Sequence, residues 1–76
     1  MTEKYKLSIL GENLKILRDQ SKQTQEDVTH ITEKSLTYIR NIESGITDPK
    51  VTFLMSLLDT YNYSGTVKDL YKRVLQ

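Results

Sequence analysis

Leucines recur at helical spacing in the first quarter of the chain. Leu10, Leu14 and Leu17 stand four and three residues apart, and charged residues such as Glu12 occupy the positions between them. Residues spaced by three and four lie on one face of an α-helix, so this arrangement gives a helix one apolar stripe and one polar side. The pattern predicts a first helix over residues 8–20.

A second, shorter helix is predicted after the polar link at residues 21–23. Thr24 can cap it, because a threonine hydroxyl accepts a hydrogen bond from an amide of the first turn, and the acidic residues that follow favour the positive end of the helix. This helix is expected to run to about residue 32. Its apolar face is thin and consists mainly of Val28 and Ile31.

A third helix is predicted to start after Ser35, a suitable cap, and to stop at Gly45. Glycine readily adopts the left-handed conformation that closes a helix. The buried side should carry Ile39 and Ile42, while the other side carries small polar and basic residues. Two short helices that meet at a tight turn, the second with a polar outer face, are typical of a helix-turn-helix that reads DNA.

A fourth helix is expected from about Lys50, just after Pro49. Its apolar residues at helical spacing are Val51, Leu54, Leu57 and Leu58, with Phe53 and Met55 on neighbouring faces. This helix should be the most buried one, because apolar residues occupy most of its length.

A fifth helix is predicted near the C-terminus, where Thr66 and Asp69 resemble a capping box. Its apolar stripe comprises Val67, Leu70, Tyr71 and Val74. The expected fold class is therefore all-α, a compact bundle of five short helices. It forms a single domain, residues 1–76, with the helix-turn-helix at about residues 25–44.

Composition narrows the possible classes of protein. Seventy-six residues suffice for one small domain, whose core must be built from leucine, isoleucine, valine and tyrosine. The lack of cysteine and the single histidine, His30, exclude disulfides, thiolate metal sites and histidine clusters. No apolar run approaches the roughly 20 residues that cross a bilayer, and the first residues lack the apolar stretch of a signal peptide. We expect a cytoplasmic protein with no membrane contact, metal or cofactor.

Charge gives modest support for a polyanionic partner. Eleven Lys and Arg against ten Asp and Glu leave a net charge of +1. Several basic residues lie within or beside the predicted helix-turn-helix, although scattered solubilising charge explains a single lysine equally well. An enzyme is the least favoured class, because the acids lie apart from any nucleophile or second base and no small-molecule site is evident.

The central segment resembles the Cro/C1-type, or XRE-type, helix-turn-helix proteins of phages and bacteria. The matching positions, in register over about residues 10–70, are Leu17-Arg18, Thr24-Gln25-Glu26, Ser35, Tyr38-Ile39, and Ile42-Glu43-Ser44-Gly45 followed by Pro49. The resemblance implies a lambda-repressor-like domain of four or five helices that inserts its third helix into the major groove of double-stranded DNA. It implies a sequence-specific, repressor-like transcriptional regulator, usually a homodimer on a two-fold symmetric operator.

Base reading is expected from side chains near the start of the third helix. The major groove admits one helix and shows a distinct pattern of donors and acceptors for each base pair. Arg40 could read guanine, and Asn41 could read adenine or hold a phosphate, while Leu36 or the methyl group of Thr37 could contact a thymine methyl. The expected base-reading residues are Ser35, Leu36, Thr37, Arg40 and Asn41.

Contacts to DNA phosphates are expected around the same helix. Gln25 matches a family position that contacts the DNA backbone and braces the reading helix, and the alternative is a solvated residue of the first turn. The phosphate candidates are Gln25, Lys34, Tyr38, Ser44, Thr47 and Lys50. Such contacts fix the register of the protein on DNA rather than its sequence preference.

Arg18 and Glu43 occupy positions at which family members place an internal salt bridge. The resemblance therefore gives them a structural role in place of a phosphate contact and a catalytic acid. If the pair is largely buried, the loss of one partner would leave the other charge unpaired.

The chain departs from the family pattern at the turn and in the second helix. Glu33 stands where the family commonly has glycine, so a left-handed conformation there would cost roughly 1 kcal/mol. Lys34 stands where a buried valine or isoleucine is usual. Thr29 and Thr32 replace the common alanine and leucine, which leaves the second helix with less apolar surface to pack.

The stripe of the fifth helix, Val67, Leu70, Tyr71 and Val74, is the expected dimer interface, and the alternative is that it packs wholly into its own core. A second hypothesis for function is a protein-interaction module that retains the fold but does not read DNA, such as an antirepressor or assembly factor. The near-neutral charge and the thin second helix favour it slightly. DNA binding that weakens steeply with salt would separate the two hypotheses.

Overall fold

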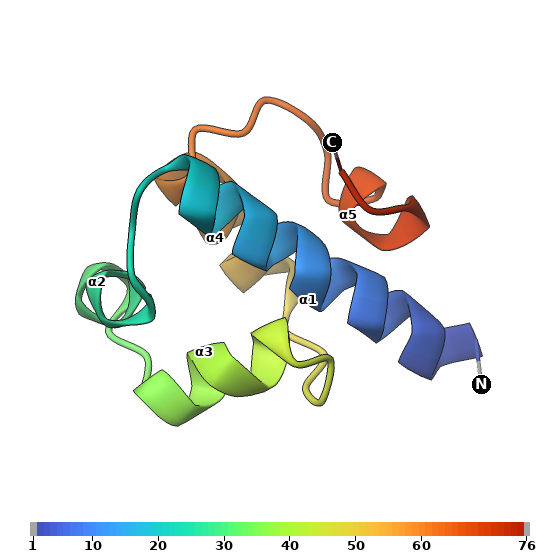
Figure 1. Ribbon diagram of the computed structural model, residues 1–76, viewed down its shortest axis with the longest axis horizontal. Coiled ribbons are helices and arrows are strands. Elements are labelled where there is room, and N and C mark those ends of the chain that lie inside the picture. The colour runs from blue at the N-terminus through green and yellow to red at the C-terminus, as the bar shows by residue number, and fades with distance from the viewer. Residues whose placement is uncertain (1, 76) are drawn as a thin grey trace.

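The computed structural model describes residues 2–75, which form five helices and no strand. Figure 1 shows α1 (Thr2–Gln20) crossing the whole domain, with α2 (Gln25–Thr32) at its left end and α3 (Leu36–Glu43) below it. Helix α4 (Val51–Thr60) lies behind α1 in this view, and α5 (Asp69–Lys72) packs near the N-terminal half of α1. The predicted all-α, five-helix fold is confirmed.

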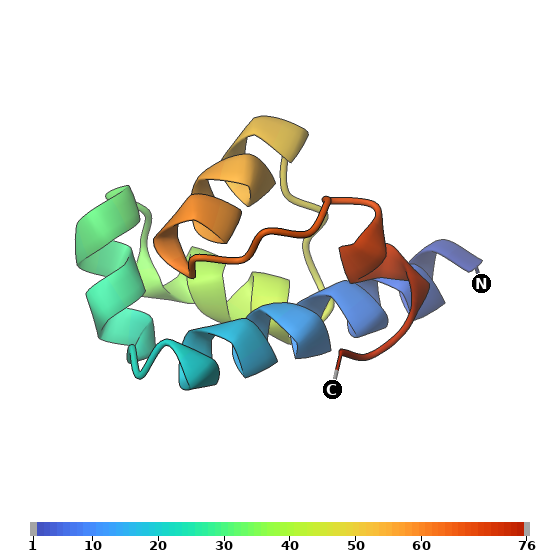
Figure 2. The ribbon, with the colours of Figure 1, turned by 90° about the horizontal axis from the view of Figure 1, so that it is seen from above.

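Helix α1 is longer and more buried than predicted. It begins at Thr2, well before the predicted start at Ser8, because its first turns are polar and lack the apolar stripe that marks the rest. It contacts both α3 and α5 (Figure 2), and it carries more buried side chains than α4. The prediction that α4 would be the most buried helix is therefore wrong. Val51 and Met55 of α4 are more than half exposed.

The core joins residues from all five helices. Its buried members are Leu10, Leu14, Leu17, Val28, Ile39, Ile42, Leu54, Leu57, Leu58, Tyr61 and Leu70. Helix α2 contributes Val28 alone. Ile31 was predicted to lie on the buried face of α2, but it is 57% exposed. The reason is position, because α2 lies at one end of the domain and packs mainly against α3.

Gly11 allows α1 and α3 to approach closely. A Cβ atom at this position would lie 2.5 Å from the carbonyl oxygen of Glu43 and 2.6 Å from that of Ile42. Both are main-chain atoms, which cannot rotate away as a side chain could. Glycine in the middle of a helix normally costs stability, so its presence here marks a contact between two backbones. This contact fixes the end of α3 against α1.

Asn13 ties α1 to the C-terminal segment. Its side-chain nitrogen donates to the carbonyl oxygens of Leu70 and Arg73, each at 2.9 Å, and its oxygen accepts from the backbone nitrogen of Leu75 at 2.6 Å. Asn13 is fully buried, so these bonds satisfy a polar group inside the core. A polar residue within the apolar stripe of α1 was the signal for this contact in the sequence.

Helix α5 is only one turn long. The backbone nitrogen of Thr66 donates to Asp69 Oδ2 at 3.1 Å, and the backbone nitrogen of Asp69 donates to Thr66 Oγ1 at 3.3 Å. These are the bonds expected of a capping box, and the one from the Thr66 backbone lowers the pKa of Asp69. Because the helix ends at Lys72, Val74 lies beyond it rather than on its apolar stripe.

Replacing Asn13 with alanine should lower the free energy of unfolding by about 2 kcal/mol, because buried backbone groups at Leu70 and Leu75 lose their partners. Urea denaturation measures this change. The same variant should exchange the amide hydrogen of Leu75 faster, while exchange in α3 stays slow. An unchanged rate at Leu75 would show that Asn13 does not hold the C-terminal segment.

Candidate nucleic-acid interface

Both helices of the helix-turn-helix begin with a side-chain cap. Thr24 and Asp27 form a capping box at the start of α2, and the hydrogen bond from the Thr24 backbone lowers the pKa of Asp27. Ser35 caps α3 by accepting from the backbone nitrogen of Tyr38 at 3.1 Å. Glu33 adopts the left-handed conformation, with a φ of 60°, where the family commonly has glycine. The turn therefore keeps helix-turn-helix geometry despite a strain of roughly 1 kcal/mol at Glu33.

The other departures from the family pattern are accommodated locally. The hydroxyls of Thr29 and Thr32 each donate to the carbonyl four residues earlier, at 3.0 and 2.7 Å. Lys34 is exposed, and its ammonium lies 5.8 Å from the ring centroid of Tyr38 and 5.7 Å from that of Phe53. At this distance the two aromatic rings attract the cation. Lys34 thus covers an aromatic pair instead of entering the core.

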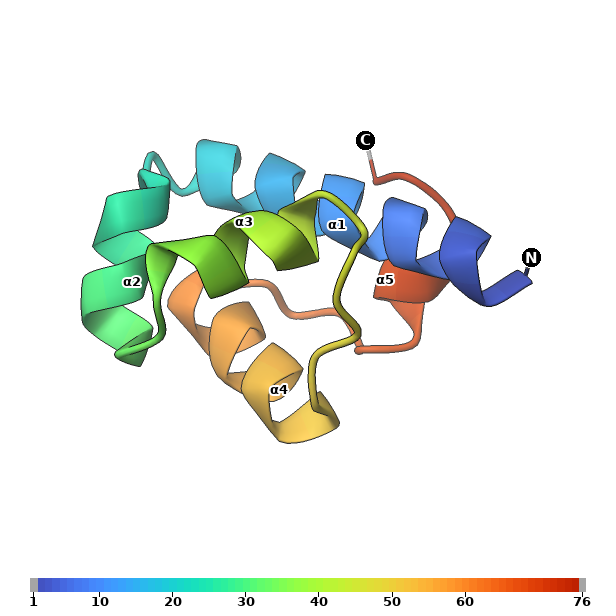
Figure 3. The same ribbon diagram turned by 90° about the horizontal axis from the view of Figure 1, so that it is seen from below.

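Helix α3 lies on the face of the domain seen in Figure 3, with α1 behind it. Two of the expected base-reading residues, Thr37 and Arg40, are exposed. Leu36 and Asn41 are half-buried. Ser35 is exposed as well, but its oxygen is engaged as the helix cap. The isoleucines of the same helix are buried, so α3 has an anchored inner face and a polar outer face.

The internal ion pair expected from the resemblance is present. Arg18 Nε donates to Glu43 Oε2 at 2.7 Å, and a terminal nitrogen of Arg18 donates to Glu43 Oε1 at 3.1 Å. The two side chains are only 10% and 6% exposed. The hydrogen bond to Glu43 raises the pKa of Arg18, and Arg18 also donates to the carbonyl oxygen of Gln23 at 2.9 Å. The pair holds α1 to the end of α3.

Gln25 extends this ion pair toward the outer face of α3. Its side-chain nitrogen donates to Glu43 Oε1 at 3.0 Å, and its side-chain oxygen accepts from Arg40 Nε at 3.4 Å. Gln25 is half-buried and bonded at both ends, so it is not a solvated first-turn residue. The buried ion pair is thus linked through Gln25 to an arginine expected to read bases.

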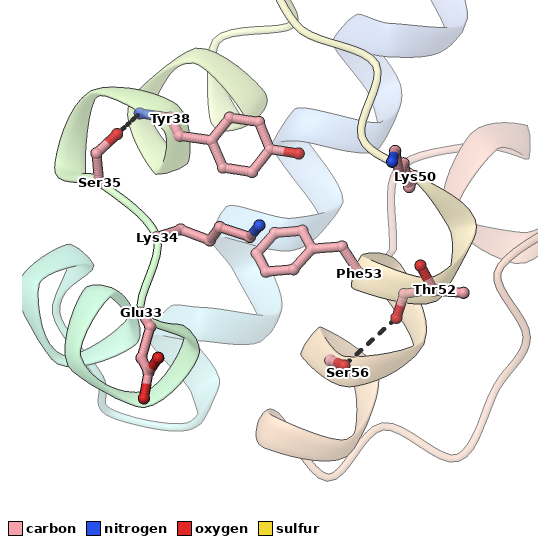
Figure 4. Close-up of a pocket in the computed structure, with 8 residues that line it drawn as sticks. All are labelled: Glu33, Lys34, Ser35, Tyr38, Lys50, Thr52, Phe53 and Ser56. Carbon is pink, nitrogen blue, oxygen red and sulfur yellow. Dashed lines mark hydrogen bonds between the residues drawn. The ribbon is translucent and has the colours of Figure 1, made fainter.

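A groove of about 650 Å³ runs between the start of α3 and the first turns of α4 (Figure 4). Lys34 and Lys50 contribute cations to it, and Tyr38 and Phe53 form its aromatic floor, with ring centroids 5.5 Å apart. Three phosphate candidates from separate parts of the sequence, Lys34, Tyr38 and Lys50, are thereby brought together. The hydroxyls of Thr52 and Ser56 also line the groove. Sequence reasoning missed these two, because only the packing of α4 places them there.

The remaining phosphate candidates lie away from this groove. Ser44 caps the C-terminal end of α3, and Gly45 has a φ of 77°, the left-handed conformation predicted for it. Thr47 follows in the loop, where its backbone nitrogen donates to the carbonyl oxygen of Asn41 at 3.3 Å. Ser44 and Thr47 therefore flank the far end of α3 from Lys34.

The four residues of the expected dimer interface do not form one surface. Leu70 is fully buried in the core of its own domain, so its prediction as an interface residue is wrong. Val67 lines a hollow beside the exposed Met55, on the α4 side of α5. Tyr71 lines a different groove, and its hydroxyl donates to Asp48 Oδ1 at 3.2 Å. Burial, together with Asp48, raises the pKa of Tyr71 to about 12.

A family model described as "Helix-turn-helix domain" matches residues 9–70, and this family sits among the Cro/C1-type helix-turn-helix families. A domain of this kind indicates DNA binding. No curated protein and no solved structure matches the chain. Within residues 2–75, no helix has the length and apolar character needed to cross a bilayer, and no group of His, Cys, Asp or Glu there could hold a metal ion.

Proposed function

Because this chain belongs to the helix-turn-helix domain family, we propose that it is a sequence-specific regulator of transcription, repressor-like in action, that reads double-stranded DNA with α3. One observation carries the proposal: α3 exposes Thr37 and Arg40 on its outer face, while Ile39 and Ile42 anchor its inner face. A rigid helix with a free polar face is what the major groove admits. Occupation of an operator by this helix would block or recruit polymerase.

The position of Arg40 supports a role in base reading. Gln25 holds Arg40 Nε and is itself held by the buried Glu43. An arginine that is oriented before binding loses less side-chain freedom when it meets a guanine. Its terminal nitrogens remain available for the O6 and N7 atoms of that base.

The groove beside α3 supports contacts to the sugar-phosphate backbone. Lys34 and Lys50 place two positive charges, against the one negative charge of Glu33, next to the start of the proposed reading helix. The hydroxyl of Thr52 adds a neutral donor along the same groove, while the hydroxyl of Ser56 already donates to the carbonyl oxygen of Thr52 at 3.3 Å. These contacts, with those proposed for Ser44 and Thr47, would set the register of α3 on the duplex.

Selection of bound duplexes from a random pool tests the proposal most directly. We expect enrichment of a defined site, with half-sites about 34 Å apart if two copies bind with two-fold symmetry. The logarithm of the binding constant should fall linearly with the logarithm of salt concentration, with a slope of about −0.9 for each phosphate contacted. A protein that retains no duplex at low salt would contradict the proposal.

Replacing Arg40 with alanine should cost about 1–3 kcal/mol of binding free energy at the selected site and relax its preference at one base pair. Arg73→Ala is the matched control, because Arg73 is exposed and lies outside α3. The affinity of both variants is measured for a library of operators with single base changes. This comparison separates a loss of sequence specificity from the general effect of removing one positive charge. Unchanged discrimination in Arg40→Ala would remove Arg40 from the readout.

A protein-interaction module without DNA reading is the second candidate function. The exposure of Ile31 on α2 favours it, because a free isoleucine on a small domain can serve a protein partner. The net charge of +1 is also low for a DNA-binding protein. The salt titration above distinguishes the candidates, because a protein-interaction module would give no duplex binding that depends on salt.

We also propose a homodimer on the operator. Of the expected interface, Val67 lines a hollow and Val74 is 43% exposed, and the exposed Met55, which was not among the predicted residues, lies beside Val67. A surface shared by two identical copies must be self-complementary, and apolar side chains satisfy this requirement readily. A selected DNA site without two-fold symmetry would count against this dimer.

A further inference from the structure

We propose that copies of this chain associate head to tail. The outer face of α2 in one copy binds a basic groove of a second copy, and in each copy this groove lies at the end of the domain opposite α2. The groove has a volume of about 600 Å³ and is lined by Tyr5, Lys6, Lys68, Tyr71 and Lys72, which we call the basic groove. It combines three positive charges with two aromatic rings. Tyr5 is 69% exposed, so much of its ring faces solvent in a single copy.

The basic groove is preformed on one side. The hydroxyl of Tyr71 is tied to Asp48, and Leu70 beside it is locked into the core. Tyr71 and its flanking lysines are therefore held by the packing of α5 against α1. A partner that binds here meets a surface that needs little ordering, which favours association.

The outer face of α2 is chemically complementary to this groove. It consists of Glu26 and Asp27 and, one turn later on the same helix, His30 and Ile31, all exposed. We call it the acidic face. It offers the carboxylate of Glu26, and the second carboxylate oxygen of Asp27, whose Oδ2 accepts from the Thr24 backbone at 2.8 Å, beside an exposed isoleucine side chain. The carboxylates are opposite in charge to the three lysines of the basic groove, and the isoleucine offers an apolar contact to the tyrosine rings that line it.

The two surfaces lie at opposite ends of the molecule. In Figure 1 the long axis is horizontal, with α2 at the left end and the N-terminal turns of α1 and α5 toward the right end. The domain measures 32 × 25 × 20 Å, so the two surfaces are too far apart to meet within one copy. An interface between different surfaces at opposite ends repeats from copy to copy and builds a ring or an open chain of more than two copies rather than a symmetric pair.

A second copy explains the features of the basic groove better than duplex DNA does. Phosphates would use the lysines but would leave the tyrosine rings and the exposed Ile31 without a role. Association of copies covers both aromatic rings and the isoleucine and pairs charges of opposite sign. Association of copies requires no DNA, so a test of it gives a result that is independent of the proposed DNA reading.

Two variants of the full chain, each with one of the two surfaces blocked, test the proposal. Both also carry Val67→Glu, which prevents the two-fold symmetric dimer proposed above from contributing to association. Ile31→Lys blocks the acidic face, and the pair Lys6→Glu with Lys72→Glu blocks the basic groove. In sedimentation experiments from about 10 µM to 1 mM protein in low salt, the parent that carries only Val67→Glu should form species larger than two copies. Each blocked variant alone should stay monomeric. An equimolar mixture should form a species of twice the monomer mass and nothing larger, because one intact surface of each kind remains.

Controls match the charge and residue type of these changes. Ile46→Lys alters another isoleucine that is 70% exposed, and Lys15→Glu with Lys22→Glu alters two exposed lysines outside both surfaces. Both controls should associate as the parent does. Raising salt from about 50 to 500 mM should weaken association of the parent by roughly tenfold. Circular dichroism of every variant checks that the helices are intact.

Four outcomes would overturn the proposal. The parent could remain monomeric at the highest concentration, or either blocked variant could associate as the parent does. The mixture of the two blocked variants could fail to form a pair although each variant is folded. Finally, Lys6→Glu with Lys72→Glu could leave association unchanged and weaken duplex binding, which would make the basic groove a DNA contact.

Discussion

Replacement of Glu43 by alanine is expected to lower the free energy of unfolding by about 3–5 kcal/mol. The carboxylate of Glu43 receives two hydrogen bonds from Arg18, and the side chain of Arg18 is only 10% exposed. Without Glu43, a guanidinium remains in a site that water reaches poorly. Urea denaturation followed by circular dichroism measures the loss. A domain of this size has a total stability of roughly 5–15 kcal/mol, so the variant should be close to unfolding.

Two controls separate this buried pair from ordinary surface charge. Asp19 also lies near Arg18, at 3.5 Å, but its side chain is 63% exposed, so Asp19→Ala should change stability by less than about 0.5 kcal/mol. Replacing both partners, Arg18→Met with Glu43→Leu, should cost less than Glu43→Ala alone, because no unpaired charge is left in the core. Equal losses for Glu43→Ala and Asp19→Ala would contradict the structural role of Glu43.

Replacing Gly11 with alanine should lower the free energy of unfolding by about 3 kcal/mol, although alanine is the better helix former. The added Cβ would lie 2.5 Å from a carbonyl oxygen at the end of α3. Separation of the two backbones would cost on the order of 4 kcal/mol, and the gain in helix propensity returns only about 1 kcal/mol. Thermal or urea unfolding of the variant measures the balance.

Gly65→Ala provides the comparison for Gly11→Ala. A Cβ at Gly65 would meet the ring of Tyr63, a side chain that can rotate away. We therefore expect Gly65→Ala to cost less than Gly11→Ala, by about 2 kcal/mol. If Gly11→Ala is instead stabilising, α1 and α3 must lie farther apart than the structure shows.

The helices and their caps could be predicted from the sequence, because the residues that specify them lie close together in the chain. Thr24, Ser35 and Gly45 each act within one helical turn, and each has the conformation or hydrogen bond expected of it. The start of α1 was not readable, because its first turns lack an apolar stripe to mark them. Ile31 has the spacing of a core residue, yet nothing in the spacing shows that α2 lacks a neighbour on that side.

Features that join distant segments were beyond local reasoning. The bonds of Asn13 span more than fifty residues, and the groove beside α3 depends on how α4 packs against it. The pairing of Arg18 with Glu43 was expected only through resemblance to a family, since neither spacing nor composition joins them. Leu70 was wrongly predicted as an interface residue, because an apolar stripe in the sequence does not show whether it faces its own core or a second copy.

The chain of contacts from Arg18 through Glu43 and Gln25 to Arg40 joins a buried ion pair at one end to an exposed arginine at the other. Substitutions at Arg40 change the exposed end of that chain and leave the buried pair in place. Under the proposed base reading by Arg40, a protein of this fold could acquire a new operator through position 40 while its scaffold stays the same. Gln25 contacts both ends, so a change there would alter the scaffold and the recognition of DNA together.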